Sequence, residues 1–376
     1  MLNSLRPALA RTLRGPLGAC IILAGALVFA APAQALTCGQ VVSGVVTLTA
    51  DLVCQNTTGL IVQANDTTIN LDGHSIRCLS ASGYEGSCQA PNVGQAIGNS
   101  GIQVAPNGWT LGGPVIDNIK IIGPGEIYGF EYGINVTGAF DVLVDNVTIT
   151  GPVDDHPPSL VNPGRSFAAG IDVTDGQCNR DLPAQHSITI ESSDISNQSI
   201  GIWMSAVSCA VVEKNFIHDN TGSHKSFFVD GILLAGQASP PWPVSERNVF
   251  ANNRIFRNGN NVNQFNWPGN WQFMFPEYDA GIDISGGTAT HNLIFHNDVV
   301  GNCGDGIEFN IAASDNIVSD NTSVDNATLT YGGRCLTVPK GTFFDAAERW
   351  QGIVNKWDPN NHCDTKSPTV PATACL

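Results

Sequence analysis

The stretch that decides the fold is GIDISGGTATHNLIFHNDVVGN, residues 281–302. It contains a Gly-Ile pair, a short apolar segment around Ile294, a turn at Asn297 and a second Asn at position 302. The same pattern begins again at Gly306 with GIEFNIAASDNIVSDNTSVDN, and it occurs earlier in the chain with insertions. Self-similarity over such short periods is typical of solenoids.

Aligning the copies gives three columns of recurring residues. The first is the Gly-Ile pair, which starts at Gly101, Gly133, Gly170, Gly201, Gly231, Gly281 and Gly306. The second column contains Asn146, Ser192, Asn215, Asn253, Asn297 and Asn321. The third contains Gly151, Asn197, Asn220, Asn258, Asn302 and Asn326. Between the columns, β-branched apolar residues recur at period two, which indicates short strands.

Asn recurs where the chain must bend. We expect it there because Asn tolerates left-handed backbone angles and its amide can bond nearby backbone groups. Identical amides stacked one coil apart can also bond each other. The pattern therefore predicts an all-β fold, a parallel β-helix in which each coil lays short strands on the coil before it and encloses a continuous apolar interior.

The columns resemble the right-handed parallel β-helix repeats of the pectin-lyase-like superfamily. Residues 48–52 (LTADL) and 69–76 (INLDGHSI) are similar to the opening coil of exported members. The resemblance spans residues 38–326 and implies a single-stranded, right-handed β-helix solenoid with disulfide-tied caps. It does not select an activity, because that superfamily includes lyases, hydrolases, epimerases, phage spikes, adhesins and non-catalytic proteins.

The two ends of the chain differ from the repeats. Residues 1–35 combine basic residues, an apolar run over 20–31 and a small-residue cleavage site, as a secretory signal does. The run is too short to span a bilayer, so we expect a secreted or periplasmic protein with the β-helix at 36–326. Residues 327–376 are expected to form a C-terminal cap and tail. Within them, residues 342–357 have roughly helical apolar spacing and predict a short capping helix.

The charge balance is strongly acidic. Removing residues 1–35 takes three of the 17 basic residues and none of the 33 acidic ones, which leaves a formal charge of −19. Such a surface repels nucleic acid and anionic lipid. We therefore expect no nucleic-acid partner, no membrane partner after signal cleavage, and a monomer.

Ten of the 11 Cys follow residue 35. An even number in an exported chain indicates disulfides, and proximity suggests the pairs Cys38–Cys54, Cys78–Cys88 and Cys363–Cys375. The sequence contains no Cys-x-x-Cys pair and no helical His pair, so it does not indicate a metal site.

Insertions indicate where function lies. Three insertions leave the helix at the corner before a Gly-Ile pair (152–169, 221–230 and 259–280), and two leave after the Gly-Ile strand (174–186 and 235–247). Stacked insertions should form two walls, with the Gly-Ile-x-Φ strands as the floor between them. The outward-facing column of that floor is Gln103, Asn135, Asp172, Trp203, Leu233, Asp283 and Glu308.

Asp283 and Glu308 are expected on adjacent coils, about 4.8 Å apart along the stack. Like charges this close raise one pKa and leave the other group ionised, which is the acid-and-base pair of a glycosidase. Close carboxylates also suit Ca²⁺, the one cofactor that the sequence leaves open, or they can simply decorate an exposed strand. Asp230 and Asp305 precede Gly-Ile pairs and can join either arrangement.

Aromatic residues gather around the same floor. Candidate substrate-binding residues are Asp172 and Trp203 on the floor, and Trp242, Trp267, Trp271 and Tyr278 in the walls. Flat apolar faces beside polar groups suit pyranose rings, although long loops also need aromatics to pack themselves.

Basic residues in the same insertions allow a different reaction. A lyase abstracts a proton beside a uronate carboxylate, and Lys225 or His224 could act as the base with Arg247 neutralising that carboxylate. We expect an exported, carbohydrate-active protein that cleaves a polysaccharide as a hydrolase or lyase. The alternative is a non-catalytic β-helix that binds glycans or a surface.

Overall fold

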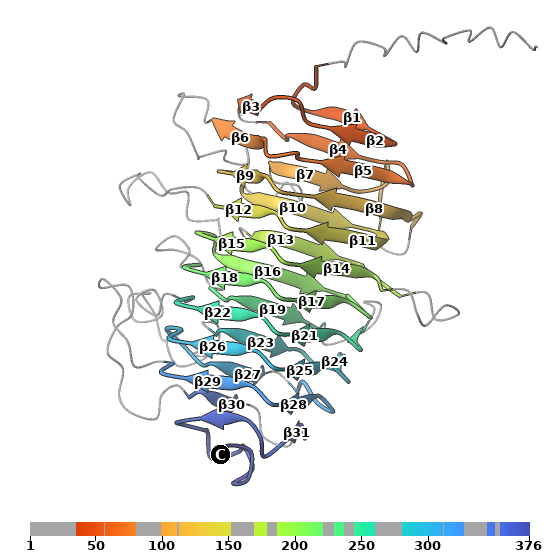
Figure 1. Cartoon of the computed structure of the whole chain (residues 1–376). Helices are drawn as coiled ribbons and strands as arrows, with labels where there is room; N and C mark the ends of the chain where they lie inside the picture. The colour runs from red at the N-terminus through yellow and green to blue at the C-terminus, as the bar shows by residue number, and fades with distance from the viewer. Residues whose placement is uncertain are drawn as a thin grey trace, which may run out of the picture. The chain divides into compact units, whose positions relative to one another are not determined.

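The chain divides into two compact units, Met1–Ala35 and Leu36–Leu376, and the second contains the fold (Figure 1). The computed structural model describes residues 35–55, 57–79, 99–110, 113–151, 169–178, 186–220, 229–236, 244–259, 280–310, 312–326, 344–349 and 354–376. Over these ranges the secondary structure is strand and turn, and no helix there could cross a membrane.

Three parallel sheets of ten strands each run the length of the second unit. Sheet A contains β1 (Gln40–Val42), β4 (Leu60–Val62), β7 (Ser100–Val104), β10 (Tyr132–Thr137), β13 (Ala169–Thr174), β16 (Ile200–Ser205), β19 (Ile232–Ala235), β23 (Ile282–Ser285), β27 (Ile307–Asn310) and β30 (Ala346–Glu348). Sheet B contains β2 (Val45–Thr47), β5 (Thr67–Asn70), β8 (Ile116–Ile122), β11 (Ala139–Asp145), β14 (Ile188–Glu191), β17 (Val211–Glu213), β21 (Val249–Ala251), β25 (Leu293–Phe295), β28 (Ile317–Ser319) and β31 (Lys356–Trp357). Sheet C contains β3 (Leu52–Gln55), β6 (Ser75–Leu79), β9 (Glu126–Tyr128), β12 (Thr148–Thr150), β15 (Asp194–Ser196), β18 (Phe216–His218), β22 (Arg254–Phe256), β26 (Asp298–Val300), β29 (Thr322–Val324) and β32 (His362–Cys363). A small two-stranded sheet pairs β20 (Ser245–Glu246) with β24 (Ala289–Thr290).

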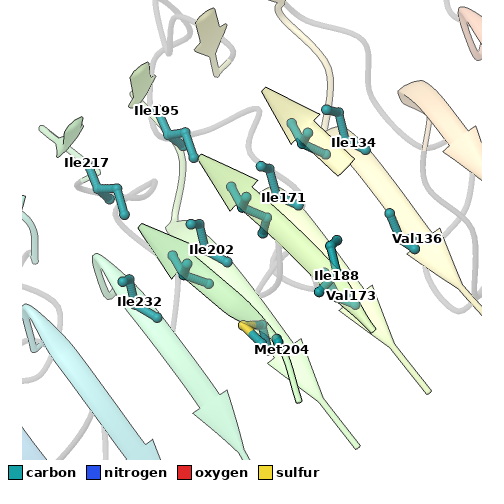
Figure 2. Packing of buried hydrophobic residues seen from close by; sticks show 14 of the residues in the cluster. Ile134, Val136, Ile171, Val173, Ile188, Ile195, Ile202, Met204, Ile217 and Ile232 are labelled. Carbon is teal, nitrogen blue, oxygen red and sulfur yellow. The ribbon is translucent and has the colours of Figure 1, made fainter. Parts of the chain in front are cut away.

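Successive strands belong to different sheets, so each coil contributes one strand to A, one to B and one to C. This is the predicted parallel β-helix. The inward side chains form one core along the stack, and Figure 2 shows part of it, with Ile171 and Ile202 of sheet A near Ile195 and Ile217 of sheet C. All four are fully buried, and burying an isoleucine side chain stabilises a fold by about 1.5–3 kcal/mol.

The Gly column has a steric cause. A Cβ at Gly281 would lie 2.4 Å from Cγ1 of Val299, and one at Gly231 would lie 2.6 Å from Cγ2 of Ile255. Both contacts are with the core-facing side chain of a sheet C strand. The corner before sheet A therefore has no room for a side chain, which explains why glycine recurs there.

The Asn columns form hydrogen-bonded ladders at the turns. One ladder joins sheets A and B and contains Asn248, Asn292, Asn316 and Asn355. The ladder between B and C contains Ser193, Asn215, Asn253, Asn297, Asn321 and Asn361, and the ladder between C and A contains Asn220, Asn258, Asn302, Asn326 and Asp345. In each Asn-to-Asn step, the backbone N–H and the amide Nδ2 both donate to the side-chain oxygen one coil further on, as Asn253 does to Asn297 at 3.0 Å.

The predicted stacking of amides is confirmed, but the conformational reason given for Asn holds only at some turns, such as Asn146 and Asn197. In most steps the left-handed residue is the one before the ladder Asn, with φ of 55° at Asn252 and 54° at His296. For the same reason, the columns place Asn146, Ser192 and Asn197 one residue too early. These three residues have left-handed angles, and the ladder position follows them.

The C-terminal region differs from the prediction. The helix expected over residues 342–357 is wrong where the structure describes that segment, because β30 and β31 extend sheets A and B there. Over so few positions, the spacing of apolar residues does not separate a helix from a short buried strand. All three sheets thus continue past residue 326, and residues 364–376 follow the last strand.

Disulfides tie both ends of this unit. Cys38–Cys54 and Cys363–Cys375 form as predicted, and Cys178–Cys209 adds a bond that the sequence did not indicate. Cys78 is disulfide-bonded, while its predicted partner, position 88, lies outside the described residues.

Candidate active site

The predicted floor column exists in the predicted register. Asn135 pairs with Asp172, Asp172 with Trp203, Trp203 with Leu233, Leu233 with Asp283, and Asp283 with Glu308. Asp283 and Glu308 are therefore neighbours on adjacent strands, β23 and β27. Their Cα positions correspond directly, so the two backbones lie about one strand spacing, ~4.8 Å, apart.

Both carboxylates are buried. The exposed fraction is 0% for Asp283 and 1% for Glu308, so the interpretation that they decorate an exposed strand does not hold. Burial, followed by the charges of Asp305 and Asp283, raises the pKa of Glu308 well above its ordinary value. The ionised form of Glu308 is therefore disfavoured in this site.

Asp305 joins the pair and brings in a residue from the last coil. Its Oδ2 accepts a hydrogen bond from Nε of Arg349 at 2.6 Å, and Nη2 of Arg349 lies 2.5 Å from the same oxygen. Its Oδ1 accepts the backbone N–H of Phe344 at 2.5 Å. Burial raises the pKa of Asp305, but the Arg349 charge, the Phe344 N–H and a hydrogen bond with Glu308 all oppose that increase.

Arg349 is the site residue that sequence reasoning missed. It follows β30 directly and lies inside the segment expected to be helical. Its Nε is 3.9 Å from Oε1 of Glu308, and its side chain is 13% exposed. The strand before it, AAE at residues 346–348, adds one more coil to sheet A. This strand lacks the Gly-Ile pair that marks the other coils, so the repeat pattern does not point to Arg349.

Asp230 has the same corner position as Asp305, one residue before a Gly-Ile pair. Its Oδ1 accepts the backbone N–H of Ala280 in the next coil at 2.7 Å. Asp230 is fully buried. The structure therefore gives it a role in joining two coils.

Asp172 lies three strands away from Asp283 in the same column. Its Oδ2 accepts a hydrogen bond from Asn135 Nδ2 at 2.7 Å. Burial raises the pKa of Asp172 to about 7, although the hydrogen bond with Asn135 lowers it. Burial, together with the charge of Asp172, also raises the pKa of Tyr132.

Trp203 is half-buried beside this carboxyl. Together with Tyr132 it packs against a small apolar cluster formed by Ala169, Ile200 and Leu233, which is separate from the interior core. An aromatic and apolar surface with one buried carboxyl is thus present on the floor where a sugar ring was expected.

Arg247 lies elsewhere. It has left-handed angles (φ 59°) in the turn before Asn248, its side chain is 61% exposed, and its Nη2 is 3.7 Å from Oε1 of Glu246. No contact described for it joins it to the acidic residues of sheet A.

The remaining candidates, positions 224, 225, 242, 267, 271 and 278, lie outside the described residues. Within the described residues, no group of three or more His, Cys, Asp or Glu side chains is arranged to hold a metal ion. The cationic group described beside the acid cluster is the guanidinium of Arg349.

The fold and the register identify the class of protein as a parallel β-helix, in which Asp172, Asp283 and Glu308 share one column of sheet A. Residues 100–338 match the family described as the right-handed β-helix region, and the chain belongs to this family. No curated protein matches the chain.

Solved structures with similar architecture include a periplasmic alginate epimerase, with 15% identity, 76% of this chain and 62% of that chain covered, and a TM-score of 0.44. They also include an exopolygalacturonase from Thermotoga maritima (10% identity, 77% and 73% covered, TM-score 0.38) and a pectate lyase (14% identity, 90% and 82% covered, TM-score 0.38). The chain thus spans less than two thirds of the epimerase. These likenesses assign no activity to this chain.

Proposed function

We propose that this protein is an exported glycoside hydrolase that cleaves a polysaccharide over sheet A. Glu308 is the general acid, and Asp283 is the second carboxylate. The observation that carries the proposal is the direct pairing of Asp283 with Glu308 on adjacent coils, with both groups buried and the pKa of Glu308 raised.

The chemistry follows from these two protonation states. The protonated Glu308 gives its proton to the leaving glycosidic oxygen as the bond to the anomeric carbon breaks. The carboxylate of Asp283 is then available for attack on that carbon, and water later releases the sugar with Glu308 acting as base. A separation near one strand spacing, ~4.8 Å, is close to the ~5–5.5 Å of retaining enzymes, so we propose retention of configuration.

A lyase is less well supported. Proton abstraction beside a uronate needs a base and a cation near the substrate carboxylate. Arg247 lies in an exposed turn and pairs with Glu246, and positions 224 and 225 lie outside the described residues. The described part of the site therefore favours hydrolysis.

The test is a panel of neutral and acidic polysaccharides, scored for new reducing ends and for the absorbance of unsaturated uronates. We expect reducing ends without unsaturated product, and a loss of about 10³-fold in rate for Glu308→Gln and Asp283→Asn. Asp298→Asn is the matched control, because Asp298 is a half-buried carboxylate on sheet C. If both site variants cleave as fast as the wild type, the assignment is wrong.

A second function, glycan binding without cleavage, is favoured by one observation. Trp203 and Tyr132 line an apolar surface beside Asp172, whereas the acid pair is shielded from solvent. In that case Trp203→Ala abolishes retention on immobilised glycan, Glu308→Gln leaves retention unchanged, and no glycan of the panel gains reducing ends.

Export is part of the proposal. The support is the set of disulfides at Cys38–Cys54, Cys178–Cys209 and Cys363–Cys375, since such bonds persist in oxidising compartments. N-terminal sequencing of the protein recovered outside the cytoplasm should begin at Leu36. Recovery of the uncleaved chain from the cytoplasm alone would contradict export.

A further inference from the structure

We propose that Arg349 is a positioning residue of the acid site: it fixes the negative charge on Asp305, so that the proton held by the buried carboxyls resides on Glu308, next to Asp283. This inference rests on the proposed function for its catalytic meaning, but its structural content can be tested without any substrate. It makes the last coil a part of the site.

The geometry ties Arg349 to Asp305 at two places. The guanidinium lies against Oδ2, with Nε at 2.6 Å and Nη2 at 2.5 Å. Oδ1 accepts the N–H of Phe344, which lies at the other end of the same strand segment. One carboxylate therefore holds both ends of residues 344–349, and the Phe344 ring lies 5.5 Å from the guanidinium carbon.

Arg349 cannot swing freely away from this position. Its backbone N–H donates to the carbonyl of Phe309 at 2.9 Å, and the preceding residue, Glu348, pairs with Phe309 in sheet A. The backbone thus fixes where the arginine side chain begins. A cation held in this way by the last strand acts as a fixed charge and not as a mobile counterion.

The charge balance explains what Arg349 does. Among the described residues, the charged groups that act on Glu308 are Asp283 from β23, Asp305 from its own coil and Arg349 from the last coil. Three buried carboxylates with one guanidinium would leave two uncompensated negative charges if all were ionised, which is too costly in a desolvated site. One carboxyl must therefore keep its proton.

The position of the cation decides which carboxyl that is. Arg349 touches Asp305 at 2.6 Å but is 3.9 Å from Glu308. A short, charge-assisted hydrogen bond stabilises the ionised form of its acceptor. Asp305 is therefore the ionised member, and Glu308, which lies further from the guanidinium, is the protonated member.

The experiment is a pH titration of the full mature chain, with ¹³C-labelled Asp and Glu carboxyls observed by NMR. The variants are Arg349→Met, which removes the charge at similar length, and Arg349→Lys, which keeps it. Spectra of Asp305→Asn and Glu308→Gln assign the two resonances. Circular dichroism at each pH confirms that the chain is folded.

In the wild type we expect Glu308 to be protonated and Asp305 ionised at neutral pH. Arg349→Met should raise the midpoint of Asp305 by about one unit or more, and Arg349→Lys should restore most of the wild-type value. An unchanged Asp305 midpoint in folded Arg349→Met overturns the proposal.

A second measurement applies if Arg349→Met does not fold. Asp305→Asn removes the negative neighbour and keeps the arginine, so the midpoint of Glu308 should fall by about one unit or more. An unchanged midpoint overturns the proposal as well. Because these readouts are titrations, their failure is distinct from failure of the cleavage assay.

Discussion

The Asn ladder between sheets B and C makes a quantitative prediction at Asn297. Its Oδ1 accepts the backbone N–H and the Nδ2 of Asn253, both at 3.0 Å. Its Nδ2 donates to Oδ1 of Asn321 at 3.0 Å and to the carbonyl of Phe250 at 2.9 Å. Asn297→Ala therefore removes these four hydrogen bonds and a fifth, from Nδ2 to the carbonyl of Phe295 at 3.1 Å, while shortening the side chain by only three heavy atoms.

The magnitude follows from what is left behind. The N–H of Asn253 loses its acceptor, whereas Nδ2 of Asn253 still donates to the carbonyl of Val212. A buried donor without a partner costs about 1–3 kcal/mol. Adding the weakened acceptor at Phe250, we expect Asn297→Ala to lower the free energy of unfolding by about 2–4 kcal/mol.

The assay is urea unfolding of the mature chain with its disulfides intact, followed by far-ultraviolet circular dichroism. Asn360→Ala is the control, because Asn360 is exposed and its backbone N–H donates to Asp358 without use of its own amide. The control should stay within about 0.5 kcal/mol of the wild type. Equal unfolding midpoints for the two variants would refute the ladder as a source of stability.

Three further predictions use other parts of the chain. Burial lowers the pKa of His218, but hydrogen bonds with two aspartates outweigh it and raise the pKa to about 9. The protonated imidazole therefore stabilises the fold by about 1–2 kcal/mol after allowing for solvent screening, in full below pH ~6.5, and this contribution is lost as pH rises through ~9. His218→Gln should flatten that part of a stability–pH curve. The pKa of Asp172, raised to about 7, means that stability falls as pH rises from ~4 to ~7, by at most ~4 kcal/mol; Asp172→Asn should remove the fall, and an identical curve would contradict a buried carboxyl there. Gly281→Ala places a Cβ 2.4 Å from Val299 and should cost about 1–3 kcal/mol from overpacking, so an unchanged urea midpoint would show that the corner has room.

The repeat was predictable because period and register are written in the chain. The Gly-Ile pairs align the strands of sheet A, and that alignment alone places Asp283 beside Glu308. Alternation along each strand then decides which side chains face outward. For these features, residues that occupy the same position in successive repeats are neighbours in the structure.

The features that failed are those in which spacing carries less information. The ladder Asn and the left-handed residue before it are adjacent, so both explain an Asn-rich turn, and only hydrogen bonds separate them. The strand at residues 346–348 lacks the Gly-Ile mark, so its coil was not recognised and Arg349 was not placed. The burial of Asp283 and Glu308 is also not predictable from a period-two pattern. The pattern shows to which face of the strand a side chain points, but not whether other residues cover that face.

The direction of the ladders has a consequence for how the polypeptide assembles. In each Asn-to-Asn step, the backbone N–H and the amide Nδ2 donate to the coil on the C-terminal side, and Nδ2 also donates to a carbonyl of the preceding coil, so each turn of the chain needs the turn that is made after it. Asp345, Asn355 and Asn361 are the final acceptors of the three series. A nascent or truncated chain that stops earlier leaves ladder donors without acceptors at three corners at once. We therefore expect the chain to reach its native state only after the last coil has formed.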